Sequence, residues 1–307
     1  MRTVAFIGNF EVPFSTESHH AYTWMQLGWN VIKLQENKTN GYEVANACKI
    51  SDLLQWTHTH GWSFPGEKEM MSTIMHGSAS QPKIPSFSYH LDKYFGIGSR
   101  ENNYLDHPSF HLDYFFSTDG GNEEGWKQAG INHHWILPGV VEYGCKMGRS
   151  IDNIRVLFTG SVGYHSEYLF RPRMVEALKA NYGESFQVRT GYREDALNDL
   201  YASATVCVGD HIFAGCPRYC SDRLFETIGR GGFIIYPETE GITETIPGLV
   251  TYKPQDIQDL IHKIDYFLDR DHEPERIERR NAAFEYVKQH GTYTNRLRQI
   301  LEIMNLA

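Results

Sequence analysis

The sequence contains no long apolar segment. None of its apolar runs approaches the roughly 20 residues that a membrane-spanning helix requires. Residues 1–8, Met-Arg-Thr-Val-Ala-Phe-Ile-Gly, begin a strand pattern at once, without the cleavage-site pattern of a secretory signal peptide. We therefore expect a cytoplasmic protein.

Several well-known catalytic loops are also missing. There is no Gly-x-Ser-x-Gly elbow, which argues against a hydrolase triad, and no Gly-Lys-Ser/Thr loop, which argues against a P-loop NTPase. The turn at 159–163, Thr-Gly-Ser-Val-Gly, is glycine-rich but is not the full dinucleotide fingerprint. The missing fingerprint counts against a nicotinamide-dependent oxidoreductase.

The sequence has fewer basic than acidic residues and only five cysteines. The chain has 29 Lys and Arg against 38 Asp and Glu, a formal charge of −9, which argues against binding nucleic acid by bulk attraction. The five cysteines are an odd number, which favours free thiols. Cys216 and Cys220 could share a metal only with His211, and their spacing matches no common zinc pattern, so we expect no metal site.

What the sequence does have is a regular alternation of strand and helix patterns. In the first half, the predicted strands are Thr3–Ile7, Asn30–Leu34, Leu53–Thr57, Ile84–Ser88, Tyr114–Ser117 and His134–Leu137. The main predicted helices between them are Thr16–Leu27, Gly41–Lys49, Glu67–Met75 and Glu123–Ala129. Repeated strand–helix–strand units of this length predict a parallel sheet with helices on both faces.

The alternation pauses at 138–153 and then starts again, which predicts a second domain of the same class. The predicted strands of this second half are Arg155–Thr159, Phe186–Thr190, Thr205–Val208, Gly232–Ile235 and Val250–Tyr252. The fold class is therefore α/β, with two tandem doubly wound Rossmann-like domains that face a cleft. We expect an acceptor-side domain over 1–148 and a donor-binding domain over 149–293. Ligands bind at the carboxyl ends of the strands in such sheets.

The most informative segment is Ser221–Ile235, which predicts a short helix, a glycine turn and a buried strand. Ser221 or Asp222 can cap the helix start, where backbone N–H groups favour anions. Arg223 and Glu226 lie three residues apart on one helix face, either as a salt bridge or as separate ligand contacts. A carboxylate such as Glu226 can accept hydrogen bonds from two ribose hydroxyls.

Other strand ends in the second half supply further polar groups. The turn with Gly160 and Ser161 can approach a phosphate or be a plain tight turn. Arg171 follows it and can pair with a diphosphate, or be solvated. Asp210 ends a buried strand, and Arg218 lies in the loop before the key helix, where it can stabilise a leaving group.

In the first half, His90 and Asp92 follow a buried strand and are candidates for a general base. Asp92 could instead cap the next segment. His58 and His60 end another strand, and we interpret them as acceptor-binding or structural residues rather than metal ligands. Asp119 precedes a glycine pair and is either an acceptor ligand or part of a turn.

These segments resemble a known family. Residues 156–161, 197–202 and 223–235, with the closing helices, are similar to GT-B glycosyltransferases, particularly those with a CgeB-like C-terminal domain. The resemblance is specific in the second half and loose in the first. It implies that Glu226 binds the donor ribose, that Arg223 lies near the diphosphate, and that no metal is needed. Arg218 stands where related enzymes often carry a first glutamate. The helix within 294–307 is expected to return to the first domain, as this fold commonly does.

We therefore predict a glycosyltransferase that uses a nucleotide sugar, with UDP favoured over GDP, and no further cofactor. The acceptor is a glycan, a small molecule or a modified DNA base. The alternatives are an NAD(P)-dependent oxidoreductase and a non-catalytic nucleotide- or sugar-binding protein. The predicted catalytic residues are Asp92 and His90, and the acceptor-binding residues are His58, His60 and Asp119. The predicted donor-binding residues are Gly160, Ser161, Arg171, Asp210, Arg218, Arg223, Phe225 and Glu226.

Overall fold

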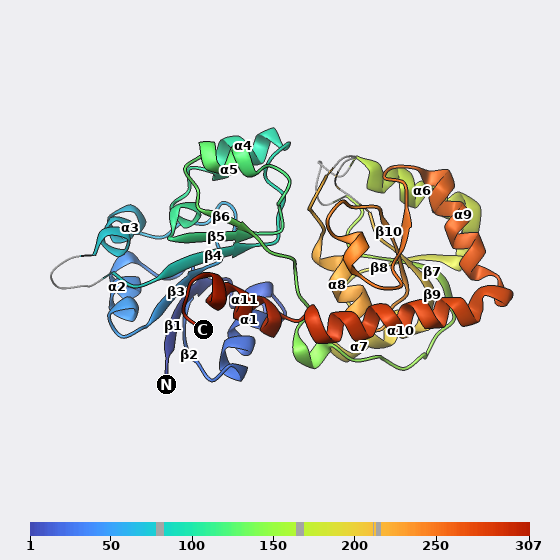
Figure 1. The fold of residues 1–307 in the computed structure, drawn as a ribbon, viewed down its shortest axis with the longest axis horizontal. Helices are drawn as coiled ribbons and strands as arrows, with labels where there is room; N and C mark the ends of the chain where they lie inside the picture. The colour runs from blue at the N-terminus through green and yellow to red at the C-terminus, as the bar shows by residue number, and fades with distance from the viewer. Residues whose placement is uncertain (78–82, 164–168, 211, 213–215) are drawn as a thin grey trace. The chain divides into compact units, whose positions relative to one another are not determined.

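The computed structural model describes residues 1–77, 83–163, 169–210, 212 and 216–307. The chain forms two compact units (Figure 1). The first unit is Met1–Leu137 with Tyr293–Ala307, and the second unit is Pro138–Thr292. The sequence-based boundary was placed after residue 148, but the structure divides the chain after Leu137. The reason is that residues 138–148 pack on the second unit. There Asn198 Nδ2 donates to the carbonyls of Gly144 and Lys146, at 3.0 and 2.7 Å.

The first unit is built on a parallel sheet of six strands in the order β2-β1-β3-β4-β5-β6. These strands are β1 (Thr3–Gly8), β2 (Asn30–Gln35), β3 (Leu53–Trp56), β4 (Ser86–His90), β5 (Tyr114–Ser117) and β6 (His133–Trp135). Every residue of β3 and β4 is buried, as expected for central strands covered on both faces.

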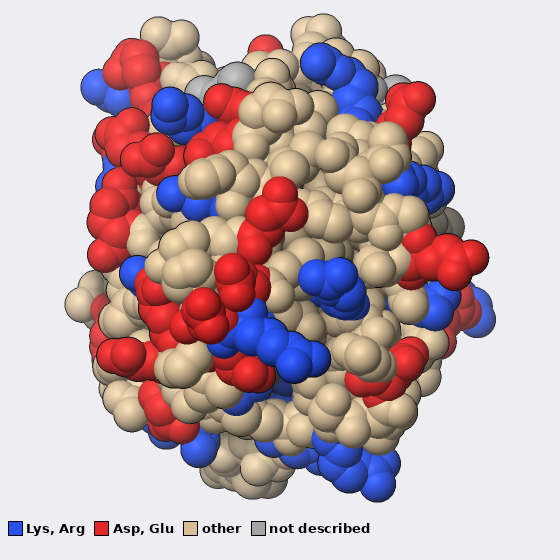
Figure 2. Space-filling view, turned by 90° about the vertical axis from the view of Figure 1, so that its right-hand side faces the viewer, with Lys and Arg blue, Asp and Glu red and all other residues tan. Residues whose placement is uncertain are grey.

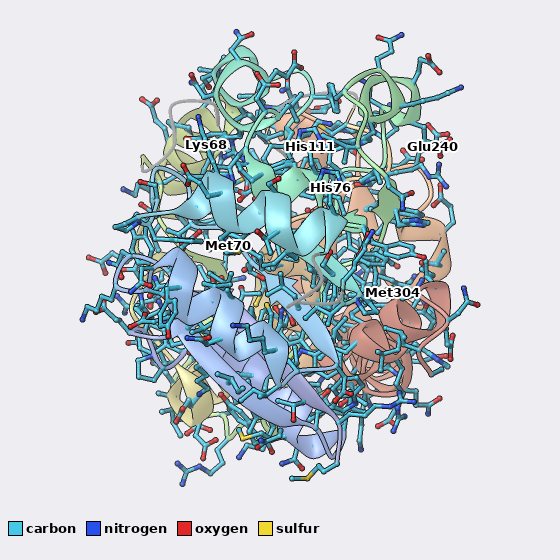
Figure 3. All side chains as sticks on the ribbon, turned by 90° about the vertical axis from the view of Figure 1, so that its left-hand side faces the viewer. Lys68, Met70, His76, His111, Glu240 and Met304 are labelled. Carbon is cyan, nitrogen blue, oxygen red and sulfur yellow. The ribbon has the colours of Figure 1, made fainter. Side chains whose placement is uncertain are left out.

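The helices of the first unit are α1 (Thr16–Gln26), α2 (Gly41–Lys49), α3 (Glu67–His76), α4 (Gly98–Tyr104), α5 (Glu123–Gln128) and α11 (Tyr293–Ile303). Figure 3 shows α2 and α3 side by side, with Met70 of α3 buried in the core. The last helix, α11, packs against α1 and buries Leu297 and Ile300 completely. The first unit is therefore closed by a helix that comes from the far end of the chain.

The second unit has a parallel sheet of five strands in the order β11-β10-β9-β7-β8. The strands are β7 (Ile154–Thr159), β8 (Phe186–Arg189), β9 (Ala204–Val208), β10 (Ile234–Pro237) and β11 (Val250–Tyr252). The helices are α6 (Phe170–Tyr182), α7 (Glu194–Ser203), α8 (Asp222–Gly229), α9 (Ile257–Leu268) and α10 (Glu273–His290).

Both sheets reverse their strand order once, and this fixes where ligands can be held. In the first unit the reversal lies between β1 and β3, and in the second between β7 and β9. Loops after such neighbouring strands run in opposite directions and leave a crevice at the carboxyl edge. Most of the predicted site residues follow strands of these two sheets at that edge.

Most of the predicted strands and helices are confirmed. The predicted helix 41–49 and the strands 114–117 and 250–252 have the same bounds in the structure. Helix α4 was not predicted, and the strand expected at 232–235 begins at Ile234. No helix among the described residues is long and apolar enough to cross a bilayer.

Candidate functional site

Two arginines and one aspartate form a buried cluster at the strand reversal of the second unit. Asp210, just after β9, accepts from Arg171 Nε at 2.8 Å and from Arg223 Nη1 at 2.9 Å. The Asp210 side chain has no exposed surface. Both guanidinium groups also lie over the ring of Phe158, 5.6 and 4.8 Å from its centroid. A single carboxylate therefore holds two cations in fixed positions.

The turn after β7 is built around these arginines. Arg223 Nε donates to the Thr159 carbonyl at 2.9 Å, and Arg171 Nη1 donates to the Ser161 carbonyl at 3.0 Å. Gly160 has a φ of +110°, and a Cβ there would lie 2.9 Å from Arg223 Nη2. Glycine is needed at 160 for both reasons. The predicted residues Gly160, Ser161, Arg171, Asp210 and Arg223 are thus brought together.

The amino end of α8 has no side-chain cap. Ser221 is the N-cap residue by backbone conformation, but its hydroxyl makes no capping hydrogen bond. Its Oγ atom is buried without a partner among the described residues. The predicted N-cap position of Ser221 is confirmed, but its side chain does not make the hydrogen bond of a cap. Within the described residues, no capping hydrogen bond from Ser221 occupies the first N–H groups of α8, which suits an anionic ligand beside Arg223.

Glu226 pairs with a different arginine from the one expected. It accepts from Arg230 Nε one turn along α8, whereas Arg223 turns to Asp210. Arg230 also donates to Asn198 Oδ1 at 2.6 Å, which fixes the guanidinium. Burial raises the pKa of the Glu226 carboxyl, and the Arg230 charge opposes that shift. The alternative of an Arg223–Glu226 salt bridge is wrong, and 17% of the Glu226 side chain stays accessible.

Two other predicted donor residues are held by contacts of a different kind. Phe225 is fully buried, and its ring packs against Gly291. A Cβ on that glycine would lie 2.9 Å from Phe225 Cδ1, so the ring anchors α8 in the core. Its assignment as a donor contact is corrected to a packing role. Arg218 has a φ of +52° and its N–H donates to the Glu240 carbonyl at 3.0 Å. His211, which borders the same loop, lies outside the described residues.

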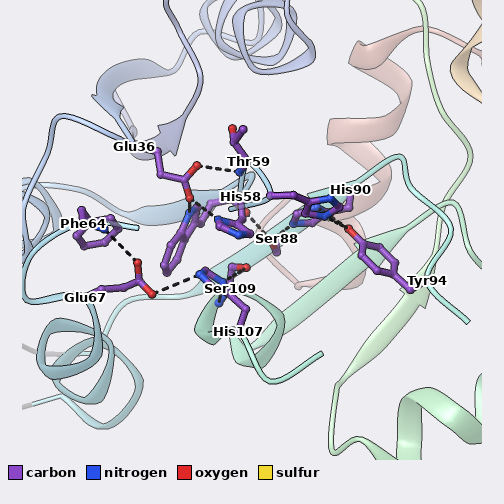
Figure 4. A network of polar contacts seen from close by, with 12 residues as sticks. Glu36, His58, Thr59, Phe64, Glu67, Ser88, His90, Tyr94, His107 and Ser109 are labelled. Carbon is purple, nitrogen blue, oxygen red and sulfur yellow. Dashed lines mark hydrogen bonds and ion pairs between the residues drawn. The ribbon is translucent and has the colours of Figure 1, made fainter. Parts of the chain in front are cut away.

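In the first unit, a buried glutamate orients one of the predicted histidines (Figure 4). Glu36, directly after β2, accepts from His58 Nδ1 at 2.6 Å and from Trp56 Nε1 at 2.7 Å. Its other oxygen accepts from the Thr59 N–H at 2.8 Å. His58 donates from Nδ1 to this carboxylate, so Nε2 is the ring nitrogen that is left to contact a ligand. The ring also stacks on His107 with centroids 3.7 Å apart.

His90 is enclosed in a chain of hydrogen bonds (Figure 4). Ser88 Oγ donates to the Trp56 carbonyl, so it accepts from His90 Nε2 at 3.0 Å. The opposite nitrogen, Nδ1, therefore accepts from the Tyr94 hydroxyl at 3.0 Å. Burial lowers the pKa of His90 well below its usual range, so the ring is neutral. Both nitrogens are occupied, and the prediction of direct catalysis is corrected to a positioning role.

The same chain of hydrogen bonds determines which ring nitrogen of His60 carries the proton. Since the Tyr94 hydroxyl gives its proton to His90, its oxygen accepts from His60 Nε2, 3.2 Å away. The lone pair of His60 then lies on Nδ1. Burial lowers the pKa of His60, and the Asp92 charge opposes that shift. His60 stacks on Tyr104 with centroids 4.0 Å apart and is only half-buried.

The two predicted aspartates of the first unit differ in accessibility. Asp92 pairs with Arg100 Nη1 at 3.0 Å, yet 45% of its side chain is exposed. Asp119 is fully buried and binds Lys93 Nζ at 2.8 Å. It also accepts from the N–H groups of Tyr94 and Phe95, at 2.8 and 3.0 Å. Asp119 therefore holds the loop after β4, and its assignment to acceptor binding is corrected to this structural role.

Some residues of the site were missed from sequence. Glu36 follows β2 without any motif around it, although its place at a strand end beside the β1–β3 reversal was a usable signal. Arg230 was not among the predicted site residues, although its spacing of four from Glu226 predicts their ion pair. The described residues contain no group of three or more His, Cys, Asp or Glu side chains placed to hold a metal ion.

Comparison with known proteins agrees with this layout. The family model described as "Glycosyl transferase-like" matches residues 152–302. No curated protein sequence matches the chain.

Solved structures match over the whole chain. HepE from Anabaena, solved with UDP and glucose, has a TM-score of 0.66 and 11% identity and covers 100% of both chains. A sucrose-phosphate synthase from Thermosynechococcus elongatus has a TM-score of 0.63 and 12% identity over 99% of each chain. A glycosyltransferase from Rickettsia africae has a TM-score of 0.62 and 12% identity, covering 98% of this chain and 97% of its own.

Proposed function

We propose that this chain transfers a sugar from a nucleotide sugar to an acceptor hydroxyl. Its residues 152–302 match the glycosyl transferase-like family, and its fold is that of GT-B glycosyltransferases. The Asp210 cluster carries the proposal. It places two arginines and the open amino end of α8 at the strand reversal of a parallel sheet. Such an assembly suits a nucleoside diphosphate.

The chemistry needs the leaving group to be stabilised. The acceptor oxygen forms a bond to the anomeric carbon while the bond from that carbon to the diphosphate oxygen breaks, so negative charge grows on the diphosphate. Arg223, Arg171 and the first N–H groups of α8 are the groups that would offset this charge. Glu226 would accept hydrogen bonds from the ribose hydroxyls, through the oxygen that Arg230 leaves open.

The acceptor side is assigned to the first unit. Asp92 is the accessible carboxylate after β4, and we assign it the proton of the acceptor hydroxyl. The ring nitrogens His58 Nε2 and His60 Nδ1 are the neighbouring groups that would orient that hydroxyl. Exchange of Asp92 for Asn should reduce turnover with the nucleotide affinity unchanged. Full turnover in this variant would contradict the assignment of Asp92 as the proton acceptor.

The decisive test is nucleotide binding by calorimetry. Exchange of Glu226 for Ala should weaken UDP binding at least about tenfold, the loss of about 1.4 kcal/mol expected for a hydrogen bond to a charged group. Glu278→Ala, at an exposed position of α10, is the matched control and should bind as the wild type does. Equal UDP affinity in the wild type and the Glu226 variant would contradict the proposed donor site.

The same titration with GDP, ADP and TDP identifies the base. UDP is the first candidate because HepE of Anabaena, a protein of the same fold, has been solved with UDP-glucose. Loss of UDP-sugar turnover in the Asp92 and Glu226 variants, with the fold retained, separates an enzyme from a binding protein.

We further propose that the reaction needs no metal ion, because the two arginines and the end of α8 already supply positive charge. Turnover should be unchanged after chelation with EDTA. Loss of turnover that returns with added Mg²⁺ or Mn²⁺ would contradict this proposal.

A carbohydrate or small molecule is favoured over DNA as the acceptor. The chain has a net charge of −9, and the face in Figure 2 intersperses basic with acidic side chains instead of presenting a continuous basic surface. Competition of duplex DNA with UDP-sugar turnover tests the weaker alternative.

A further inference from the structure

The second unit contains a cavity at the edge of the sheet opposite to the Asp210 cluster. It has a volume of about 440 Å³ and lies between β11, α9 and α10. Its wall includes Leu249 and Val250, where β11 begins. Asp210 follows the end of β9, which runs parallel to β11 in the same sheet. The cavity is therefore separate from the proposed donor site.

The charged groups of this cavity are not fully paired. Glu275 accepts from Arg279 Nε at 2.7 Å and from the Tyr266 hydroxyl at 2.8 Å, so both of its oxygens are occupied. The two terminal nitrogens of Arg279 have no partner in the part of the chain that the structure describes. Lys263, half-buried in the same wall, likewise has no ion pair within the described residues.

Two half-buried cations against one occupied carboxylate give this cavity a net positive charge, in a chain whose total is −9. The planar end of Arg279 can bind two oxygens of one anion, and Lys263 can bind a third as a point charge. The remaining volume is larger than an oxyanion requires. The Tyr266 ring and the Thr251 hydroxyl in the wall can contact a polar organic group attached to it.

We propose that this cavity binds a small phosphate monoester, of the size of a sugar phosphate, at a site distinct from the donor site. A phosphate monoester is attracted by the net positive charge of the cavity, and its three terminal oxygens can be met by the two terminal nitrogens of Arg279 and by Lys263 Nζ. The proposal does not depend on the transfer reaction, because it rests on groups at the other edge of the sheet.

Calorimetric titration with glucose 6-phosphate tests this proposal, with glucose as the uncharged comparison. We expect saturable binding of the phosphate ester by the full-length protein and none of glucose. Lys263→Gln should weaken that binding at least about tenfold. Lys179→Gln removes the same charge from an exposed position of α6 and should leave binding unchanged. Arg279→Lys keeps the charge, loses the planar fork and should also weaken binding.

Arg223→Gln separates this cavity from the donor site. The variant should bind glucose 6-phosphate as the wild type does while its UDP affinity falls. The proposal is overturned if the wild type shows no saturable binding at millimolar ligand, if Lys263→Gln binds equally well, or if Arg223→Gln alone abolishes binding.

Discussion

At the scale of single residues, the buried Asp210 forms ion pairs with both Arg171 and Arg223. Arg171 and Arg223 also donate to the carbonyls of Ser161 and Thr159, and Asp210 is the carboxylate that joins them. Asp210 is thus a positioning residue that would act on a ligand through the arginines.

Asp210→Asn should destabilise the second unit by about 3 kcal/mol, because breaking a buried ion pair leaves its partners uncompensated. It should also weaken UDP binding. Asp195→Asn, which breaks an exposed pair with Lys146, is the control and should leave both quantities unchanged. Urea denaturation and calorimetry measure the two effects, and an unchanged unfolding midpoint for Asp210→Asn would contradict this reading of the cluster.

His20 is a second residue whose environment should have a measurable effect, here on the pH dependence of stability. Its ring stacks on Tyr89 with centroids 5.0 Å apart, and Nε2 is buried without a partner among the described residues. Nδ1 accepts from the Gln55 amide, because Trp24 Nε1 occupies the amide oxygen. Burial lowers the pKa of His20 from 6.5 to about 3.

This shift makes stability depend on pH. Between pH 6.5 and about 3 the unfolded chain holds a proton on His20 that the folded chain does not. The free energy of unfolding therefore falls by up to about 1.4 kcal/mol per unit as the pH drops through this window. His20→Phe should flatten the dependence by that amount in urea denaturation at pH 7 and pH 5. His262→Gln, at an exposed histidine, should not, and an equal slope in wild type and His20→Phe would refute the argument.

At the scale of elements, the packing of α11 on α1 should contribute measurably to the stability of the first unit. Leu297 is fully buried in this packing, whereas Arg298 beside it is exposed. Leu297→Ala should lower the free energy of unfolding by about 3 kcal/mol through the cavity it leaves. Arg298→Ala should change it little. Equal unfolding midpoints for the two variants would show that α11 contributes little to the first unit.

The elements themselves could largely be predicted from sequence. Their periods and caps are local, and the bounds of α2, β5 and β11 agree with the structure. The partners of charged side chains could not be predicted in the same way. Arg223 turns to Asp210, thirteen residues away, because β9 and α8 meet only in the folded sheet. Glu36 and His58 meet for the same reason, since β2 and β3 lie on either side of β1.

At the scale of the whole molecule, the chain should behave as two units with separable responses. Under the proposed function, UDP binds only the second unit and should raise the melting temperature of that unit alone. Leu297→Ala should lower the transition of the first unit alone. Differential scanning calorimetry of the full chain, with and without UDP, measures both effects. A single transition that moves as one under both changes would contradict separable units.

The place of α11 has a consequence for the order in which the molecule is made. The ribosome completes residues 138–292, the whole second unit, before it begins α11. The second unit can therefore fold on the nascent chain while the first still lacks the helix that covers α1. The apolar surface of α1 stays open throughout that interval, so the stage most exposed to aggregation and to chaperone binding belongs to the unit that is synthesised first and finished last.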